Sequence, residues 1–211
     1  MTSPAEMVET QLRARGIHDR RVLDAMLRIP REQFVPENLR GQAYEDSPLP
    51  IGFGQTITQP YMTALMVELL ELKGFEKVLD VGTGSGYHAA VLGALAWKVI
   101  SIERIPELTV LARANLARAG LDKNVTVLCG DGSEGVPEEA PFDAISVAAA
   151  SPHTPPALVE QLHDPGILVI PVGGREDQDL RVIRKHDGKI ATRFASSCRF
   201  VPLVGRQGWK E

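Results

Sequence analysis

The sequence has little cysteine, and its potential metal ligands do not cluster. Cys129 and Cys198 lie far apart in the chain, and the five histidines are scattered. Disulfide frameworks in short sequences show several closely spaced cysteines, and zinc sites show closely spaced Cys or His ligands. Neither pattern occurs here. We therefore expect free thiols in a reducing compartment and no bound metal.

Long apolar runs are also absent. The longest, residues 89–97, is far shorter than the roughly 20 residues that cross a bilayer, and it fits a buried helix. The N-terminal stretch contains acidic residues and lacks the apolar core of a signal peptide. We expect a native N-terminus, a cytoplasmic location and no association with membranes.

The chain has no surplus of positive charge. Its 23 Lys and Arg residues against 27 Asp and Glu residues give a net charge of −4. Proteins that grip nucleic-acid phosphates usually show a basic surplus. The only basic concentration, 13–21, is interpreted as the solvated face of an N-terminal helix. We expect no nucleic-acid partner.

The middle of the chain alternates between strand and helix patterns. The expected strands are apolar throughout, which is typical of a parallel sheet covered on both faces. The expected strands cover 77–81, 98–103, 125–130, 142–148 and 166–173, and the expected helices cover 87–97 and 106–120. This order predicts a mostly parallel, doubly wound α/β sheet with right-handed crossovers.

Different patterns flank this core. Residues 180–185 and 189–194 surround Asp187-Gly188, a strong turn signal, and predict an antiparallel hairpin. The first fifty residues look mostly helical. With 211 residues, the chain suits one domain better than two. We divide 1–211 into a helical cap (1–50), a lid and helix (51–72), a cofactor-binding core (76–172) and C-terminal strands (173–211).

A glycine-rich loop joins the first core strand to the helix after it. Glycines at such a corner let backbone N–H groups approach a ligand at the positive end of a helix. The spacing Gly82-x-Gly84-x-Gly86 differs from the dinucleotide fingerprint, whose third glycine would fall at position 87. Asp80, just before the loop, suits a ligand with an ammonium or sulfonium group and is unsuited to a pyrophosphate.

Acidic residues follow the next two strands. Glu103 can accept hydrogen bonds from both hydroxyls of a ribose, and Asp131, with Gly132 beside it, can serve an adenine amine. Together with the loop, these residues resemble the class I S-adenosylmethionine-dependent methyltransferases. The resemblance implies a Rossmann-like fold and S-adenosyl-L-methionine as cofactor, with S-adenosyl-L-homocysteine as product.

The segment after the fourth core strand limits the chemical classes to which the methyl acceptor can belong. Amine methyltransferases of this class usually carry an Asn/Asp-Pro-Pro-aromatic motif there, whereas residues 145–156 read ISVAAASPHTPP. No catalytic cysteine stands nearby. A carboxylate acceptor, with a reference pKa of roughly 4, is ionised at neutral pH and needs no general base.

Several long motifs resemble the protein-L-isoaspartate (D-aspartate) O-methyltransferases. They are LPIGFGQTITQPYM at 49–62, REQFVP at 31–36, LDVGTGSGY at 79–87, APFDAI at 140–145 and RFVPLVGRQGW at 199–209. The resemblance implies repair of damaged proteins. The misplaced α-carboxylate of an isoaspartyl residue is esterified, and the ester collapses to a succinimide that can reopen as aspartate. It also implies an exchange of the last strands of the sheet.

The resemblance also implies the site residues. Thr58 stands where the family carries a serine of catalytic importance. It either orients the acceptor through its hydroxyl or only caps the helix that begins near Pro60. Val204 replaces a threonine of some relatives, so we expect no contact there, and His153 is interpreted as an ordinary loop residue. The expected cofactor-binding residues are Gln55, Thr56, Ile57, Thr58, Asp80, Gly82, Thr83, Gly84, Ser85, Gly86, Glu103, Arg104, Asp131, Gly132 and Gln207.

Two alternatives to a repair enzyme stay open at this point. One is a methyltransferase for another carboxylate acceptor, and the other is a catalytically silent relative that binds the cofactor. The only observation that suggests a silent relative is the presence of Thr58 at the position of the family serine. The expected partners are damaged proteins and peptides with isoaspartyl residues, and the expected oligomeric state is a monomer.

Overall fold

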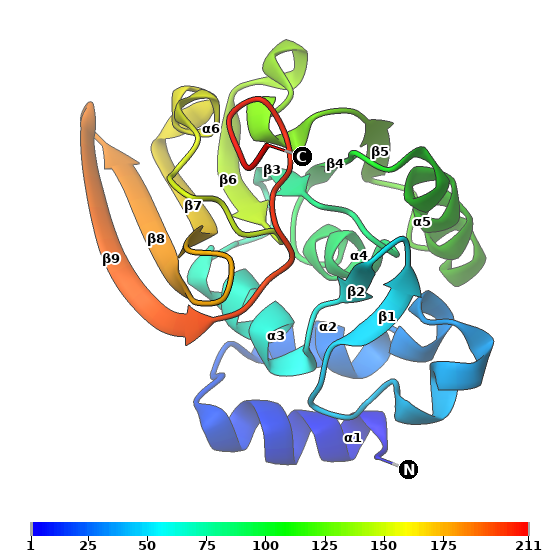
Figure 1. The fold of residues 1–211 in the computed structure, drawn as a ribbon. Coiled ribbons are helices and arrows are strands. Elements are labelled where there is room, and N and C mark those ends of the chain that lie inside the picture. The colour runs from blue at the N-terminus through cyan, green and yellow to red at the C-terminus, as the bar shows by residue number, and fades with distance from the viewer. Residues whose placement is uncertain (1, 211) are drawn as a thin grey trace.

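The core of the molecule is a seven-stranded sheet. The computed structural model describes residues 2–210. The strand order is β5-β4-β3-β6-β7-β8-β9 (Figure 1). The strands are β3 (Lys77–Val81), β4 (Lys98–Glu103), β5 (Val125–Cys129), β6 (Phe142–Val147), β7 (Leu162–Gly173), β8 (Gln178–His186) and β9 (Lys189–Cys198). The first five are parallel, and β8 and β9 are antiparallel to their predecessors.

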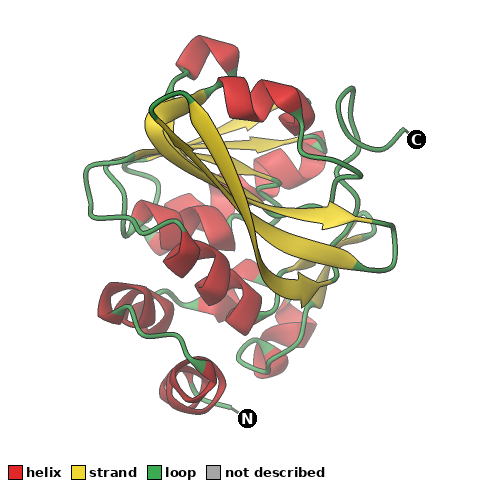
Figure 2. Ribbon diagram, turned by 90° about the vertical axis from the view of Figure 1, so that its left-hand side faces the viewer, coloured by secondary structure: helices red, strands yellow, loops and turns green. Residues whose placement is uncertain are grey.

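Two hydrophobic clusters cover the two faces of this sheet. Neighbouring residues of the central strands enter opposite clusters, so that Val78 packs on one side while Leu79 and Val81 pack on the other. Helices α4 (Tyr87–Gly93) and α5 (Pro106–Ala119) cover the first face, and α6 (Pro156–Glu160) covers the second. Figure 2 shows helices on both faces of the twisted sheet. This arrangement confirms the predicted doubly wound fold.

A helical cap precedes the sheet. Helix α1 (Pro4–Glu6) continues into a π-helical segment (Met7–Leu12) and a 3₁₀ turn (Arg13–Arg15), and α2 (Arg20–Arg28) follows. Two further 3₁₀ segments are Arg31–Phe34 and Glu37–Gln42. Met7, Leu12 and Met26 are fully buried in the cluster that also holds α3 (Pro60–Leu69). The cap is therefore packed onto the core (Figure 1).

The observed elements refine the sequence predictions. The predicted helix over 87–97 ends at Gly93, because the side-chain amide of Asn124 donates to the carbonyls of Gly93, Ala96 and Trp97 and turns the chain towards β4. Strand β7 begins at Leu162, earlier than predicted. The C-terminal hairpin is confirmed, and its turn residues, Asp187 and Gly188, have φ values of 50° and 70°.

Helix α3 begins at Pro60 as predicted. Met62, Thr63, Met66, Val67 and the C-cap residue Leu70 are buried. The helix contacts the cap and α4, so more than one side is covered. No helix within residues 2–210 is long and apolar enough to cross a membrane.

Candidate active site

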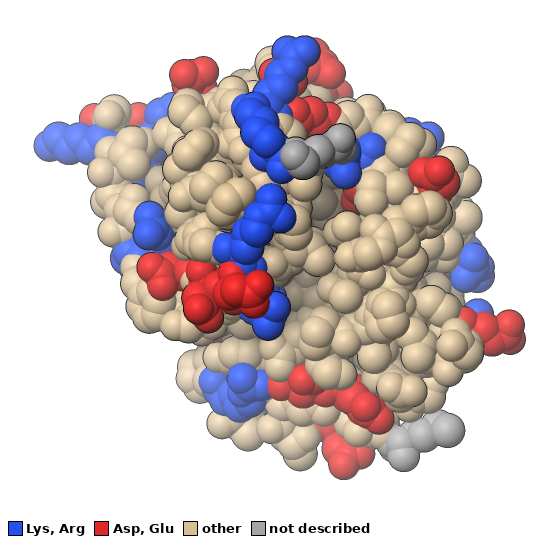
Figure 3. All heavy atoms as spheres, viewed as in Figure 1, with Lys and Arg blue, Asp and Glu red and all other residues tan. Residues whose placement is uncertain are grey.

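A cavity lies at the point where the order of the strands in the sheet reverses, between β3 and β6. Strand β3 pairs with β4 on one side and β6 on the other, so the crossovers diverge at its C-terminal end and leave a crevice there. The surface is hollowed on the corresponding face (Figure 3). The hollow contains about 890 Å³ of empty space, counted out to its open mouth. Its walls come from the glycine loop, the end of β4, residues 55–58 and residues 201–204.

The glycine loop needs its glycines for both conformation and space. Gly82, Gly84 and Gly86 have φ values of 93°, 55° and 95°, a region that residues with a Cβ rarely adopt. A Cβ on Gly84 would lie 3.2 Å from the Cδ1 atom of Ile51 in β1 (Leu49–Gly52). The loop thus passes directly beneath the β1–β2 hairpin, whose second strand is β2 (Gln55–Ile57).

Substitution Gly86→Ala is expected to lower the free energy of unfolding by about 1–3 kcal/mol, because a strained φ of 95° is combined with contacts of 3.3 Å to the Ala112 carbonyl and the Leu116 Cγ atom. Urea denaturation measures the change. Gly120→Ala is the matched control, with a φ of 68° and no atom within 4 Å of the added Cβ. An equal loss in both variants would show that crowding at Gly86 contributes nothing.

Glu103 links the glycine loop to α5. This residue ends β4, is only 7% exposed and lines the cavity. Its carboxylate accepts a hydrogen bond from the Gly84 N–H at 2.9 Å and another from the Ile105 N–H at 3.0 Å. A carboxylate has about four acceptor positions, so two remain for a ligand with paired hydroxyl groups.

The deep end of the cavity contains polar atoms without protein partners. Thr63, Ser85 and His88 line the cavity, and their Oγ1, Oγ and Nδ1 atoms are buried without a hydrogen bond. Buried polar groups are normally paired, so this end suits a ligand rich in hydrogen-bonding groups. The His88 Nε2 atom lies 2.9 Å from the Ser146 hydroxyl, and burial lowers the pKa of His88 to about 4. The imidazole is therefore neutral at physiological pH.

Asp80 lies beside this end of the cavity but not among its lining residues. It is fully buried in β3, where the Ser101 hydroxyl donates to its Oδ2 atom at 2.7 Å and its Oδ1 atom has no partner. Burial raises the pKa of Asp80 to about 7, although the Ser101 hydrogen bond acts in the opposite direction. The sequence predicted that Asp80 contacts the ligand directly. Its buried position outside the cavity wall does not favour such a contact.

The raised pKa of Asp80 predicts pH-dependent stability. The folded state binds a proton more tightly than the unfolded state, so this group contributes stability below pH 3.8 that is lost as the pH rises towards about 7. Asp80→Asn removes this titration. The variant should gain more than about 1 kcal/mol relative to the wild type between pH 4 and pH 8. Urea denaturation at both pH values measures the gain, and the contribution of His88 cancels because both proteins share it.

Residues 55–58 form one wall of the cavity. Gln55, Thr56, Ile57 and Thr58 all line the cavity. The N-cap position of α3 is Gln59, without a side-chain capping bond, and the Tyr61 N–H is bound by Asp46. The alternative in which Thr58 serves only as a helix cap therefore has no support in the geometry.

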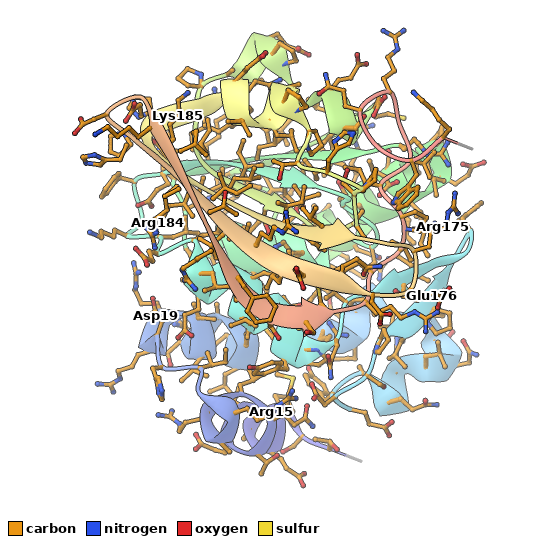
Figure 4. The ribbon with its side chains drawn as sticks, turned by 60° about the vertical axis from the view of Figure 1, so that its left-hand side comes forward. Arg15, Asp19, Arg175, Glu176, Arg184 and Lys185 are labelled. Atoms are coloured by element: carbon orange, nitrogen blue, oxygen red, sulfur yellow. The ribbon has the colours of Figure 1, made fainter. Side chains whose placement is uncertain are left out.

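A second groove meets the cavity at Thr58. The two hollows share Thr56, Thr58, Ala148, Val201 and Pro202. Arg15, Arg175 and Arg199 line the groove together with one carboxylate, Asp46. Figure 4 shows Arg175 beside Glu176 at the end of the sheet and Arg15 in the helical cap. A ligand in the cavity and a chain in the groove can therefore meet beside the Thr58 hydroxyl.

Comparison with known proteins identifies the family. The family model described as protein-L-isoaspartate(D-aspartate) O-methyltransferase (PCMT) matches residues 3–208. The chain belongs to this family. A protein-L-isoaspartate O-methyltransferase of Methanoculleus marisnigri is 56% identical over 97% of this chain and 93% of its own length. A second, from Marinobacter nauticus, is 58% identical over 96% of this chain and 93% of its own length.

Solved structures of the family have the same fold. A PCMT structure from Plasmodium falciparum, in complex with S-adenosyl-L-homocysteine, superposes with a TM-score of 0.81 at 29% identity. The superposition covers 97% of this chain and 99% of the Plasmodium falciparum chain. A further protein-L-isoaspartate O-methyltransferase gives a TM-score of 0.86 at 30% identity over 97% of this chain and 67% of its own.

Most of the predicted PCMT site residues come together in the structure. The cavity wall includes Gln55, Thr56, Ile57, Thr58, Gly82, Thr83, Gly84, Ser85, Glu103, Arg104 and Gly132. Asp80, Gly86, Asp131 and Gln207 lie outside it. The roles of all these residues in cofactor binding stay predictions.

The C-terminal segment departs most from the expected contacts. Asp131 accepts hydrogen bonds from the Arg206 N–H and from Ser133, and the Gln207 side chain accepts one from the Ala157 N–H. These bonds anchor the segment to the core. The anchored chain carries residues 201–204 along the cavity, so Val204 is a lining residue. The expectation that Val204 makes no contact with the cofactor stays a prediction. His153 is exposed and lines neither hollow, in agreement with an ordinary loop residue.

Sequence reasoning missed several other lining residues. Thr63 and His88 each directly follow a quoted motif, whereas Tyr87 ends LDVGTGSGY and Ala148 and Ala149 belong to the stretch 145–156. Their positions within or next to these stretches were the signals that could have found them. Within residues 2–210, no group of three or more His, Cys, Asp or Glu side chains could hold a metal.

Proposed function

We propose that this protein is a repair methyltransferase that moves the methyl group of S-adenosylmethionine to the α-carboxylate of L-isoaspartyl and D-aspartyl residues in damaged proteins. The observation that supports the proposal most strongly is the junction of the cavity and the groove at Thr58. This junction provides separate places for a small cofactor and an extended chain.

The cavity fits the cofactor chemically. Glu103 offers two acceptor positions to the ribose hydroxyls, and the glycine loop allows close approach of its backbone. The unpaired polar atoms of Thr63, Ser85 and His88 suit the charged amino-acid end of the cofactor. When bound, S-adenosylmethionine supplies an electrophilic methyl group on a positively charged sulfur, which keeps the electron pair of the broken C–S bond.

The groove fits an anionic acceptor in an extended chain. Arg199 forms an exposed ion pair of 2.6 Å with Glu176, and the guanidinium carbon of Arg175 lies 5.0 Å from the ring centroid of Trp209. Exposed pairs of this kind are weak and can exchange for an incoming carboxylate. Positive side chains at the entrance also raise the local concentration of anionic ligands.

Thr58 orients the acceptor and does not act as a base. The carboxylate is already a nucleophile at neutral pH, so catalysis requires alignment of one of its oxygens with the methyl carbon. Good alignment of reactants can supply roughly 7–11 kcal/mol. The Thr58 hydroxyl contributes by donating a hydrogen bond to the carboxylate oxygen that does not react.

Label transfer tests the proposal directly. Methyl-tritiated S-adenosylmethionine is offered to two peptides that differ only in an aspartyl or isoaspartyl linkage. We expect label in the isoaspartyl peptide alone, and its release as volatile methanol in mild base identifies a carboxyl ester. Labelling of a small carboxylic acid but of neither peptide would favour another acceptor. Binding of the cofactor with no transfer would favour a silent relative.

A cytoplasmic location, a monomeric state and the absence of nucleic-acid partners stay predictions from the sequence. On the face shown in Figure 3, basic side chains occur in small groups mixed with acidic ones.

A further inference from the structure

The segment that carries Thr58 is held by the helical cap through a buried arginine. Arg31 begins the 3₁₀ segment Arg31–Phe34 and is 0% exposed. Its Nη2 atom donates to the Thr58 carbonyl at 2.8 Å, and its Nε atom donates to the Ala43 carbonyl at 2.7 Å. One planar guanidinium therefore joins two chain segments far apart in the sequence.

The charge of Arg31 is not explained by packing alone. Its Nη1 atom is buried without a hydrogen-bond partner. Asp46 is near enough for its charge to favour the charged form of Arg31, although the Asp46 carboxylate pairs with Arg15. The guanidinium lies over the ring of Tyr87, 4.8 Å from the centroid. Burial lowers the pKa of Arg31 to about 10, so the group remains charged at neutral pH. Burial of a cation that no carboxylate of the described residues pairs with directly is unfavourable for stability, so the two hydrogen bonds to carbonyls point to a role in holding the backbone.

Asp46 holds the other side of the same segment. Its Oδ2 atom accepts a hydrogen bond from the Gln59 side chain at 2.8 Å, and its Oδ1 atom accepts one from the Tyr61 N–H at 3.2 Å. The Arg15 guanidinium pairs with the same carboxylate and lies over the Tyr61 ring, 3.6 Å from the centroid. Thr58 is thus enclosed between bonds to its own carbonyl and bonds to the residues after it.

We propose that Arg31 and Asp46 are positioning residues for methyl transfer, which fix the Thr58 backbone so that its hydroxyl meets the acceptor carboxylate. The inference rests on the proposed function of Thr58. It makes the N-terminal cap part of the catalytic apparatus. Thr58 stands in a short connection between β2 and α3, and such connections move more than the elements they join. A displacement of about 1 Å can slow a well-aligned reaction about 100-fold.

The first test uses Arg31→Lys. Lysine keeps the charge but lacks the planar fork that reaches two carbonyls at once. We expect kcat to fall about 10-fold, from the loss of a charged hydrogen bond. Because Arg31 does not line the cofactor cavity, the dissociation constant of S-adenosylhomocysteine, measured by calorimetry, should change less than twofold. Asp46→Ala should lower kcat similarly, and it is the second variant if Arg31→Lys does not fold.

A double-mutant cycle with Thr58→Ala separates positioning from general stability. If both residues act through Thr58, adding Arg31→Lys or Asp46→Ala to Thr58→Ala should lower kcat no further. Multiplicative losses, or a parallel loss of S-adenosylhomocysteine affinity, would overturn the proposal and leave a structural role. Arg28→Lys and Asp24→Ala are matched controls from the exposed side of the cap and should leave kcat unchanged.

If the proposed function itself is wrong, the result differs from that of a failed positioning role. The wild-type protein would then transfer no methyl group to a neutral isoaspartyl peptide, and both the proposed function and the positioning role would be rejected. Normal transfer by the wild type, with multiplicative losses in the cycle, would reject the positioning role alone.

Discussion

Replacement of Glu103 by alanine is expected to weaken the binding of S-adenosylhomocysteine about 100-fold or more. Each hydrogen bond to a charged group contributes about 1.5–3 kcal/mol, and the ribose forms two such bonds in the proposed complex. The variant also leaves the N–H groups of Gly84 and Ile105 without their present acceptor, which loosens the glycine loop. Isothermal titration calorimetry with S-adenosylhomocysteine measures the loss.

Two controls make the Glu103 experiment specific. Glu103→Gln keeps the size of the side chain and one good acceptor, so its affinity should lie between those of the wild type and Glu103→Ala. Glu107→Ala removes an exposed acidic residue from the first turn of α5 and should leave the affinity unchanged. If Glu103→Ala bound the ligand as tightly as Glu107→Ala, the ribose would have to be held elsewhere.

Replacement of Thr58 by alanine is expected to lower kcat about 10- to 100-fold, which corresponds to one hydrogen bond to a charged group. Thr58→Ser should be close to neutral, because it keeps the hydroxyl and loses only a methyl group. The binding of S-adenosylhomocysteine should change little in both variants. Steady-state methylation of an isoaspartyl peptide measures the rates.

The Thr58 pair also tests the chemical role of the hydroxyl. An orienting hydroxyl next to an ionised acceptor should give the same pH profile of kcat in the wild type and in Thr58→Ser. Unchanged kinetics in Thr58→Ala would contradict any part for this residue in catalysis.

Much of the fold can be read from the sequence because parallel strands are buried on both faces. Their residues form continuous apolar runs between glycines and prolines, and β3 and β4 have the predicted boundaries. Local chemistry also revealed the hairpin turn at Asp187 and the start of α3 at Pro60. Signals of this kind depend on a few adjacent residues, so a linear sequence contains them in full.

The same holds for parts of the site that one segment builds by itself. The glycine loop and Glu103 follow from the strand–loop–helix order, because the C-terminal ends of adjacent parallel strands meet at one edge of the sheet. The segment around Thr58 was found through family motifs. The sequence by itself therefore determined the fold class and the family, and it predicted a set of site residues most of which line the cavity.

Only the tertiary structure decided which side chains face the cavity. Asp80 belongs to the glycine motif, yet strand alternation directs it beneath α4, where Ser101 binds it. Val204 reaches the cavity because Asp131 anchors the C-terminal chain. Arg31 contacts Thr58 because the cap folds back over the site. Such contacts join residues distant in sequence, and their geometry depends on packing between elements that no local pattern encodes.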